Sequence, residues 1–140
     1  MSSPGVITRE IDRTLAINNI VANATGYVGM FRWGPANQIT RINSNEVELA
    51  QTFGTPDNET SLFFHSASNY LLYANPLLVV RVVGSTAVNA VPTGEAAILV
   101  GNDADYETVP LTGISFLARY PGVLGNSLKV SVASDIGLRS

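Results

Sequence analysis

Few residues of this sequence could carry out catalysis. His65 is the only histidine, and a hydrolase that used it would need an acid to orient the imidazole and a nucleophile next to it. Asp57 and Glu59 are the acids that such an enzyme would use. The chain contains no Gly-x-Ser-x-Gly motif, which presents a serine nucleophile on a sharp turn. We therefore expect a structural histidine and no enzyme, with a small hydrolase as the alternative from another class.

A second group of residues resembles a metal site. Asp103, Asp105 and Glu107 occupy alternate positions, as at the start of a calcium-binding loop. The sixth position of such a loop requires glycine but is Thr108 here, and the final glutamate position is Ile114. We interpret this stretch as a solvated acidic loop. The glycines form no phosphate-binding motif, and the absence of cysteine excludes thiolate metal sites and disulfides. We predict no catalytic, metal or cofactor site.

Composition narrows the classes of partner. Charged residues are only 14% of the chain, against about 25% in typical domains. The basic residues are scattered and the net charge is −3, so we expect no nucleic-acid binding. No apolar run is long enough to enter a membrane, and no signal peptide is visible. The low charge suits either a well-packed monomer or a subunit whose apolar surface is covered by neighbours, and we favour assembly. A monomeric carbohydrate-binding domain would need exposed aromatics, whereas these aromatics follow core-like patterns.

The pattern of apolar residues predicts an alternation of strands and helices up to residue 84. We expect a strand at 25–31 and an extended piece at 38–42. Asn45 followed by Glu48 matches a capping box, which predicts a helix over 46–53 that Gly54 ends.

A longer helix is expected from residue 62. Its apolar stripe is spaced for a helix, and Asn75-Pro76 ends the helix; the stripe comprises Phe63, Phe64, Ala67, Leu71 and Ala74. The continuous apolar run 77–83 then predicts a central strand buried on both faces. Further strands are predicted at 96–100, 114–117 and 128–132. The fold class is therefore α/β (α+β), with a mixed sheet and packed helices, preceded by an extended N-terminal arm.

Residues 4–21 precede this sheet and alternate in character. From Ile7 the odd positions carry apolar and basic side chains, whereas the even positions carry acidic and small polar ones. This period of two favours an extended chain. Ile7, Ile11 and Leu15 also stand four residues apart, so a helix that begins near Pro4 is an alternative.

Five groups of motifs, in order from residue 3 to residue 130, resemble contractile tail sheath proteins, and most of all those of large myophages. They are Ser3-Pro4-Gly5-Val6; Thr25-Gly26-Tyr27-Val28-Gly29-Met30-Phe31 with Trp33-Gly34-Pro35-Ala36; Asn45-Glu46-Val47-Glu48-Leu49 with Thr52-Phe53-Gly54-Thr55-Pro56; Ser66-Ala67-Ser68-Asn69-Tyr70-Leu71 with Val79-Val80-Arg81-Val82-Val83; and Ala118-Arg119-Tyr120-Pro121-Gly122 with Leu124-Gly125-Asn126-Ser127-Leu128 and Val130.

The resemblance implies a structural subunit that forms stacked hexameric rings around a tail tube and contracts to drive the tube through the host envelope. Its partners would be neighbouring sheath subunits, the tail tube protein, and baseplate and tail terminator proteins, in a virion tail assembled in the host cytoplasm. A sheath subunit of a related injection, secretion or bacteriocin machine is the alternative within this class. The N-terminal arm would add a strand to the sheet of a neighbouring subunit. The residues assigned to this arm are Pro4, Gly5, Val6, Ile7, Arg9, Ile11, Arg13, Leu15 and Ile17.

The expected domain organisation has three parts. Residues 1–22 are the extended intersubunit arm, 23–84 the α/β core, and 85–140 a β-rich continuation. Nothing in the sequence resembles the C-terminal domain of the family. We therefore expect either a portion of a sheath protein or a shortened paralogue.

Overall fold

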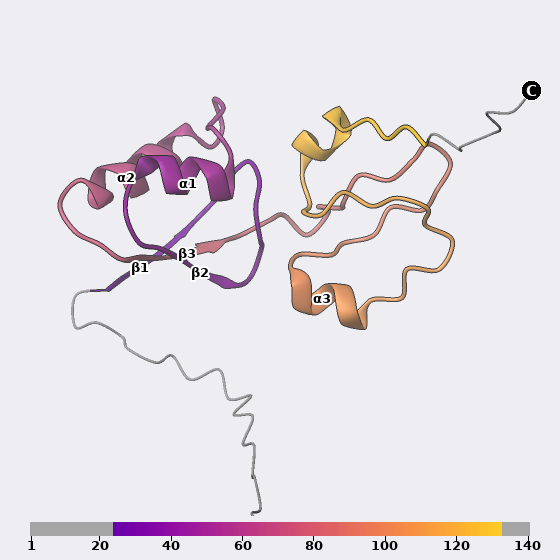
Figure 1. The fold of residues 1–140 in the computed structure, drawn as a ribbon, viewed down its shortest axis with the longest axis horizontal. Helices are drawn as coiled ribbons and strands as arrows, with labels where there is room; N and C mark the ends of the chain where they lie inside the picture. The colour runs from indigo at the N-terminus through magenta and orange to yellow at the C-terminus, as the bar shows by residue number, and fades with distance from the viewer. Residues whose placement is uncertain (1–23, 133–140) are drawn as a thin grey trace, which may run out of the picture.

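The computed structural model describes residues 24–132, which fold into two lobes joined by a short linker (Figure 1). The sheet lobe comprises residues 24–83 and holds every strand of the described part of the chain. The second lobe comprises residues 84–132 and is built mainly from loops. The residues predicted to form the N-terminal arm lie outside the described residues. No helix in the described ranges is long and apolar enough to span a bilayer.

Three strands form a mixed sheet in the order β1-β3-β2. β1 (Thr25–Gly29) pairs in parallel with β3 (Leu77–Arg81), and β2 (Ile39–Ile42) pairs with the other side of β3 in antiparallel orientation. The mixed sheet with packed helices confirms the predicted α+β class. It also confirms that the apolar run after Asn75-Pro76 supplies the central strand, although β3 ends at Arg81, two residues earlier than predicted.

Helix α1 (Glu46–Phe53) begins and ends where the capping residues predict. The Asn45 side chain accepts hydrogen bonds from the backbone N–H groups of Val47 and Glu48, which otherwise have no partner in the first turn. Gly54 follows the helix with a φ of 75°, a conformation that side-chain-bearing residues rarely adopt.

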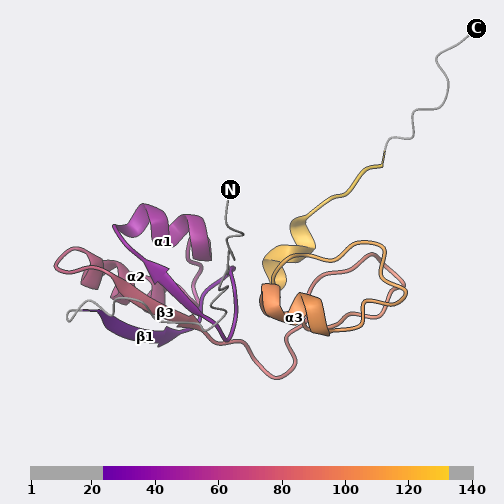
Figure 2. The same cartoon turned by 60° about the horizontal axis from the view of Figure 1, so that its bottom comes forward.

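Helix α2 (Ser61–Leu71) packs with α1 on one side of the sheet (Figures 1 and 2). Three members of its predicted apolar stripe, Phe64, Ala67 and Leu71, are buried in the core. Phe63 and Ala74 are only half-buried, and Ala74 lies beyond the end of the helix at Leu71. The three buried side chains meet apolar side chains from β2, β3 and α1, and the partly buried Tyr27 of β1 packs against this core. The remaining buried members of this core are Phe31, Ile42, Leu49, Phe53, Leu77 and Val79.

The prediction that the central strand is buried on both faces is wrong. Leu77 and Val79 are buried in the core with the helices and Arg81 is buried as well, but Leu78 and Val80 on the other face are only half-buried. Both helices cover the same face of the sheet, so no described element covers the opposite one (Figure 2). An apolar strand sequence therefore signals burial only where a second layer is present.

The strands predicted at 96–100, 114–117 and 128–132 are also wrong, because the described part of the second lobe contains no strand. Its helical pieces are α3 (Asp103–Thr108) and a 3-10 turn at Val123–Ser127. A buried side chain, Asn89, organises the loops. Its amide nitrogen donates to the carbonyls of Val100 (2.9 Å) and Ala118 (2.8 Å), and its oxygen accepts from the Val100 N–H (2.8 Å).

Candidate functional site

The histidine and the acids considered for hydrolysis are not assembled into a catalytic group. The His65 side chain is exposed on α2 and its ring lies edge-on to Phe64, with 5.7 Å between ring centroids. Asp57 instead accepts hydrogen bonds from the hydroxyl (2.8 Å) and N–H (2.9 Å) of Thr60. These bonds lower the pKa of Asp57. Among residues 24–132, no hydrogen bond or ion pair joins His65 to Asp57 or to Glu59.

The acidic stretch at 103–107 forms helix α3 and is not the loop that we predicted. Asn102 caps the helix by accepting from the N–H groups of Ala104 and Asp105. The Asp105 carboxylate accepts from the Gly101 N–H at 3.0 Å. Asp103 pairs with Arg119 at 3.1 Å, and this hydrogen bond raises the pKa of Arg119. The described residues contain no group of three or more side chains that could hold a metal ion.

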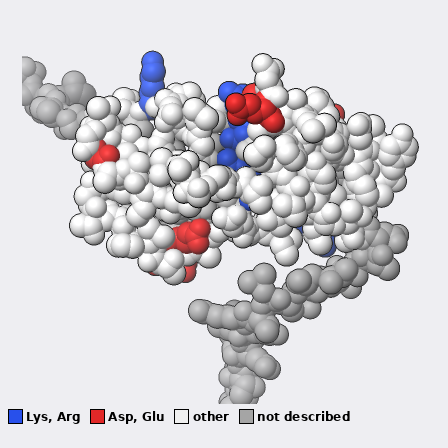
Figure 3. Space-filling model, turned by 180° about the vertical axis from the view of Figure 1, so that it is seen from behind, with Lys and Arg blue, Asp and Glu red and all other residues white. Residues whose placement is uncertain are grey.

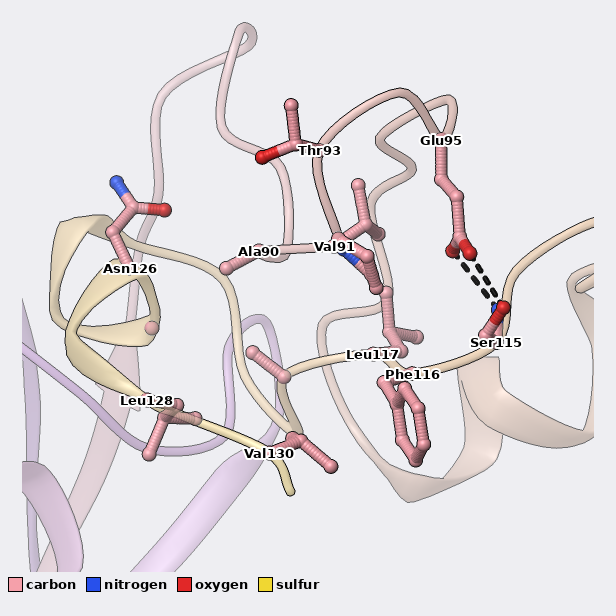
Figure 4. A pocket seen from close by; sticks show the side chains of 13 residues that line it. Ala90, Val91, Thr93, Glu95, Ser115, Phe116, Leu117, Asn126, Leu128 and Val130 are labelled. Carbon is pink, nitrogen blue, oxygen red and sulfur yellow. Dashed lines mark hydrogen bonds between the residues drawn. The ribbon is translucent and has the colours of Figure 1, made fainter. Parts of the chain in front are cut away.

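A cleft with a volume of about 670 Å³ lies in the second lobe (Figure 4). Its walls are mainly apolar and include Val91, Phe116, Leu117 and Val130. Glu95 is the acidic residue in its lining, and its carboxylate accepts hydrogen bonds from the N–H (2.9 Å) and the hydroxyl of Ser115. The cleft therefore presents mainly apolar surface, and its acidic residue is already hydrogen-bonded within the lobe.

The junction between the lobes is more distinctive, because an arginine is buried there. The Arg81 side chain is only 3% exposed. Its guanidinium donates to the backbone carbonyls of Phe31 (2.8 Å), Gly34 (2.9 Å) and Pro121 (2.8 Å). The first two acceptors belong to the sheet lobe and the third belongs to the second lobe. Burial lowers the pKa of Arg81 to about 10, so the group remains charged at neutral pH.

The junction also brings together three of the motifs on which the resemblance rests. The Trp33 ring, from the Trp-Gly-Pro turn, meets the Tyr120 ring edge-on at 5.5 Å. Arg81 comes from the Val-Val-Arg-Val strand, and Pro121 comes from the Tyr-Pro-Gly turn. The contact between these motifs was not predicted from the sequence. The sequence did contain one signal for this contact, namely the charged Arg81 within an apolar run. A charge that is buried there needs polar partners from elsewhere in the chain.

The uncovered face of the sheet is a candidate contact surface. Val28 is 64% exposed and Ile39 is 57% exposed, and both stand opposite Val80 in the register of the sheet. Leu78 extends this apolar strip along the central strand. From behind, most of the described surface is uncharged (Figure 3). Exposed apolar strips of this kind are typical of surfaces that contact other protein.

In the described residues, buried polar side chains such as Arg81 and Asn89 bond within the fold, and one apolar face of the sheet is uncovered. The comparisons with known proteins indicate which family shares this sequence. Residues 24–82 match the family model described as the tail sheath protein Gp18 domain III N-terminal region. The curated relatives include the tail sheath protein of Salmonella phage ViI, which is 34% identical over 96% of this chain and 22% of its own length.

Two further tail sheath proteins show the same extent of similarity. That of Enterobacteria phage T4 is 37% identical over 95% of this chain and 18% of its own length. That of Vibrio phage KVP40 is 35% identical over 87% of this chain and 19% of its own length. The chain spans about a fifth of the length of the curated relatives it matches. It belongs to the myophage tail sheath family and corresponds to a part of those proteins.

Proposed function

We propose that this chain is a structural part of a contractile tail sheath, which assembles as stacked hexameric rings around a tail tube and contracts to drive the tube through the host envelope. The observation that carries the proposal is the similarity to three tail sheath proteins over 87–96% of the chain. All three relatives belong to phages, which favours a phage tail over a secretion or bacteriocin machine.

The bare sheet face supports a role in assembly. A three-stranded sheet with exposed Val28 and Ile39 and half-buried Val80 leaves apolar area in water, and each Å² that a contact buries contributes roughly 25 cal/mol. The low proportion of charged residues acts in the same direction, since few charges must be desolvated when surfaces meet. A subunit of a close-packed tube would benefit from both features.

The N-terminal arm is the proposed connector between subunits. Its alternating sequence from Ile7 to Ile17 suits a strand with two different faces. A strand added to the sheet of a neighbouring subunit is held by main-chain hydrogen bonds, so the connection tolerates changes in side-chain packing. In a contracting sheath such arms would keep subunits connected while the folded bodies move as units.

The proposed partners follow from this role. They are neighbouring sheath subunits, the tail tube protein, and the baseplate and tail terminator proteins at the two ends of the tail. The location is the virion tail, with assembly in the host cytoplasm. No step of this function requires catalysis, a cofactor, nucleic-acid binding or insertion into a membrane.

Deletion of residues 2–18 tests the connector. Electron microscopy should show that the full chain is incorporated into sheath rings around tubes and that the deletion variant is not. The far-ultraviolet circular dichroism and melting temperature of the folded lobes should stay within a few degrees. A matched control replaces Ile7, Ile11 and Ile17 by valine, which keeps the alternation and every backbone hydrogen-bonding group.

Two results would overturn the proposal. The arm is not a connector if the deletion variant is incorporated into rings as well as the full chain. If deletion of the arm unfolds the lobes, the arm is part of the core and not an intersubunit connector. The sheath function itself is tested separately: antibodies against the folded lobes should label contractile tails along their length. Labelling confined to another structure, or absent from tails, would refute it.

A further inference from the structure

The junction between the lobes contains a buried charge without an acidic partner. Arg81 makes no ion pair within residues 24–132, where the two ion pairs involve Arg32 and Arg119. Three carbonyl oxygens at 2.8–2.9 Å hold the guanidinium instead. A buried charge is stabilised only when its hydrogen-bonding capacity is used, so the position of each acceptor matters.

The acceptor from the second lobe is held in place by its own surroundings. Pro121 is fully buried, and Tyr120 before it rests against Trp33 of the sheet lobe. Gly122 after it has a φ of 132° and its N–H donates to the Val88 carbonyl at 3.3 Å. A Cβ atom at Gly122 would lie 3.2 Å from Nη2 of Arg81 and 3.4 Å from the Arg32 carbonyl oxygen. An added Cβ atom would therefore crowd the arginine, and the φ itself is one that other residues rarely adopt.

A second set of contacts joins the same two lobes nearby. The Ala36 N–H donates to the Gly101 carbonyl at 2.8 Å, and the Asn102 side-chain amide donates back to the Ala36 carbonyl at 3.1 Å. Asn37, the next residue, donates its N–H to the carbonyl of Arg81 at 2.8 Å. The two sets of contacts are thus connected through the end of β3. Two separate sets of contacts fix the orientation of one lobe relative to the other, whereas a single set would permit the lobes to rotate about it.

We propose that Arg81 and the turn at Tyr120–Gly122 form a clasp between the lobes. The hydrogen bond from Arg81 to the Pro121 carbonyl holds the second lobe against the sheet lobe, so that the two lobes move as one body. Arginine suits this position because its planar group presents several donors in fixed directions and so reaches carbonyls of both lobes at once. The inference concerns the folded lobes alone and does not depend on the sheath function.

The distance between the lobes tests this clasp directly. The chain contains no cysteine, so Asn69→Cys on α2 and Glu107→Cys on α3 introduce two unique attachment sites, both exposed. With spin labels at these sites, double electron–electron resonance should give a single narrow distance distribution for the parent chain.

Two variants open the clasp from opposite sides. Arg81→Met keeps much of the apolar stem but removes all three hydrogen bonds, and Gly122→Ala pushes the turn away from the arginine. The matched control is Gly94→Ala, since Gly94 also has a positive φ (96°) but an added Cβ there would have no neighbour within 4 Å. We expect the width of the distance distribution to at least double in both clasp variants and to stay at the parent value in the control.

Each outcome decides the question. Broadening in Gly122→Ala beyond that in Gly94→Ala supports the clasp, whether or not Arg81→Met stays folded. If Arg81→Met loses the helical dichroism of the sheet lobe, the Gly122→Ala result alone is decisive. A distribution in Gly122→Ala as narrow as that of the control overturns the proposal, because the lobes would then be held together without the clasp.

Discussion

Two adjacent leucines at the end of α2 allow a sharp test of the core. Leu71 is 7% exposed and belongs to the apolar core, whereas Leu72 is 74% exposed. Leu71→Ala removes three buried carbon atoms at about 0.8 kcal/mol each, which gives about 2.4 kcal/mol before any cavity is counted. Incomplete collapse around the site adds to this value, so we expect a loss of about 2–4 kcal/mol. Leu72→Ala makes the same chemical change on the surface and should cost less than about 0.5 kcal/mol.

Urea and thermal unfolding, followed by circular dichroism at 222 nm, measure both variants. This signal comes largely from α1 and α2, so it follows the sheet lobe. For a unit of this size each kcal/mol lowers the melting temperature by roughly 4–8 °C. We expect Leu71→Ala to melt at least about 6 °C below Leu72→Ala. Equal unfolding free energies for the two variants would refute the assignment of this helix face to the core.

Three further predictions concern polar groups. Asn89→Asp loses both amide donors and places a carboxylate beside two carbonyls, so it should destabilise the second lobe by about 3 kcal/mol or more in urea unfolding, whereas Asn126→Asp on the surface should not. Hydrogen bonds from Thr60 lower the pKa of Asp57 from 3.8, so the Asp57 carboxylate stabilises the fold above that pH. This contribution disappears as the pH falls through the lower pKa of the folded state. Asp57→Asn should therefore lose less stability between pH 4 and pH 2 than the parent chain does, as measured by urea unfolding. Millimolar calcium should not raise the melting temperature, and a rise of several degrees that Asp103→Asn abolishes would contradict our interpretation of α3.

The sheet lobe was largely predictable because its local signals agree with its packing. Asn45 and Gly54 cap α1 as the sequence indicates, and the Phe64, Ala67 and Leu71 side chains of α2 face the core. Asn75-Pro76 separates α2 from the central strand. In each case the residue that marks the boundary acts through its own backbone or side chain, so the signal requires no knowledge of distant residues.

The second lobe was not predictable in the same way. Its extended segments contain β-branched residues, which favour strands. However, the backbone of these segments makes isolated hydrogen bonds and no continuous strand pairing. The Asn89 N–H donates to the Ile98 carbonyl, and the Asn89 side chain takes the place of a neighbouring strand at Val100. Such pairing depends on contacts distant in sequence. Helix α3 could have been found, since Asn102 followed by Asp103 and Asp105 is a typical helix start.

The arrangement of the sheet also determines when it can form during protein synthesis. β1 pairs with no described strand other than β3, which follows it by about fifty residues, and β2 likewise depends on β3. Translation proceeds at about 5–20 residues per second, so both outer strands leave the ribosome seconds before their partner is available. Helices α1 and α2 are complete by then but have no sheet against which to pack. Arrival of Leu77–Arg81 therefore completes all pairings of the sheet and its covered face in one late, cooperative step.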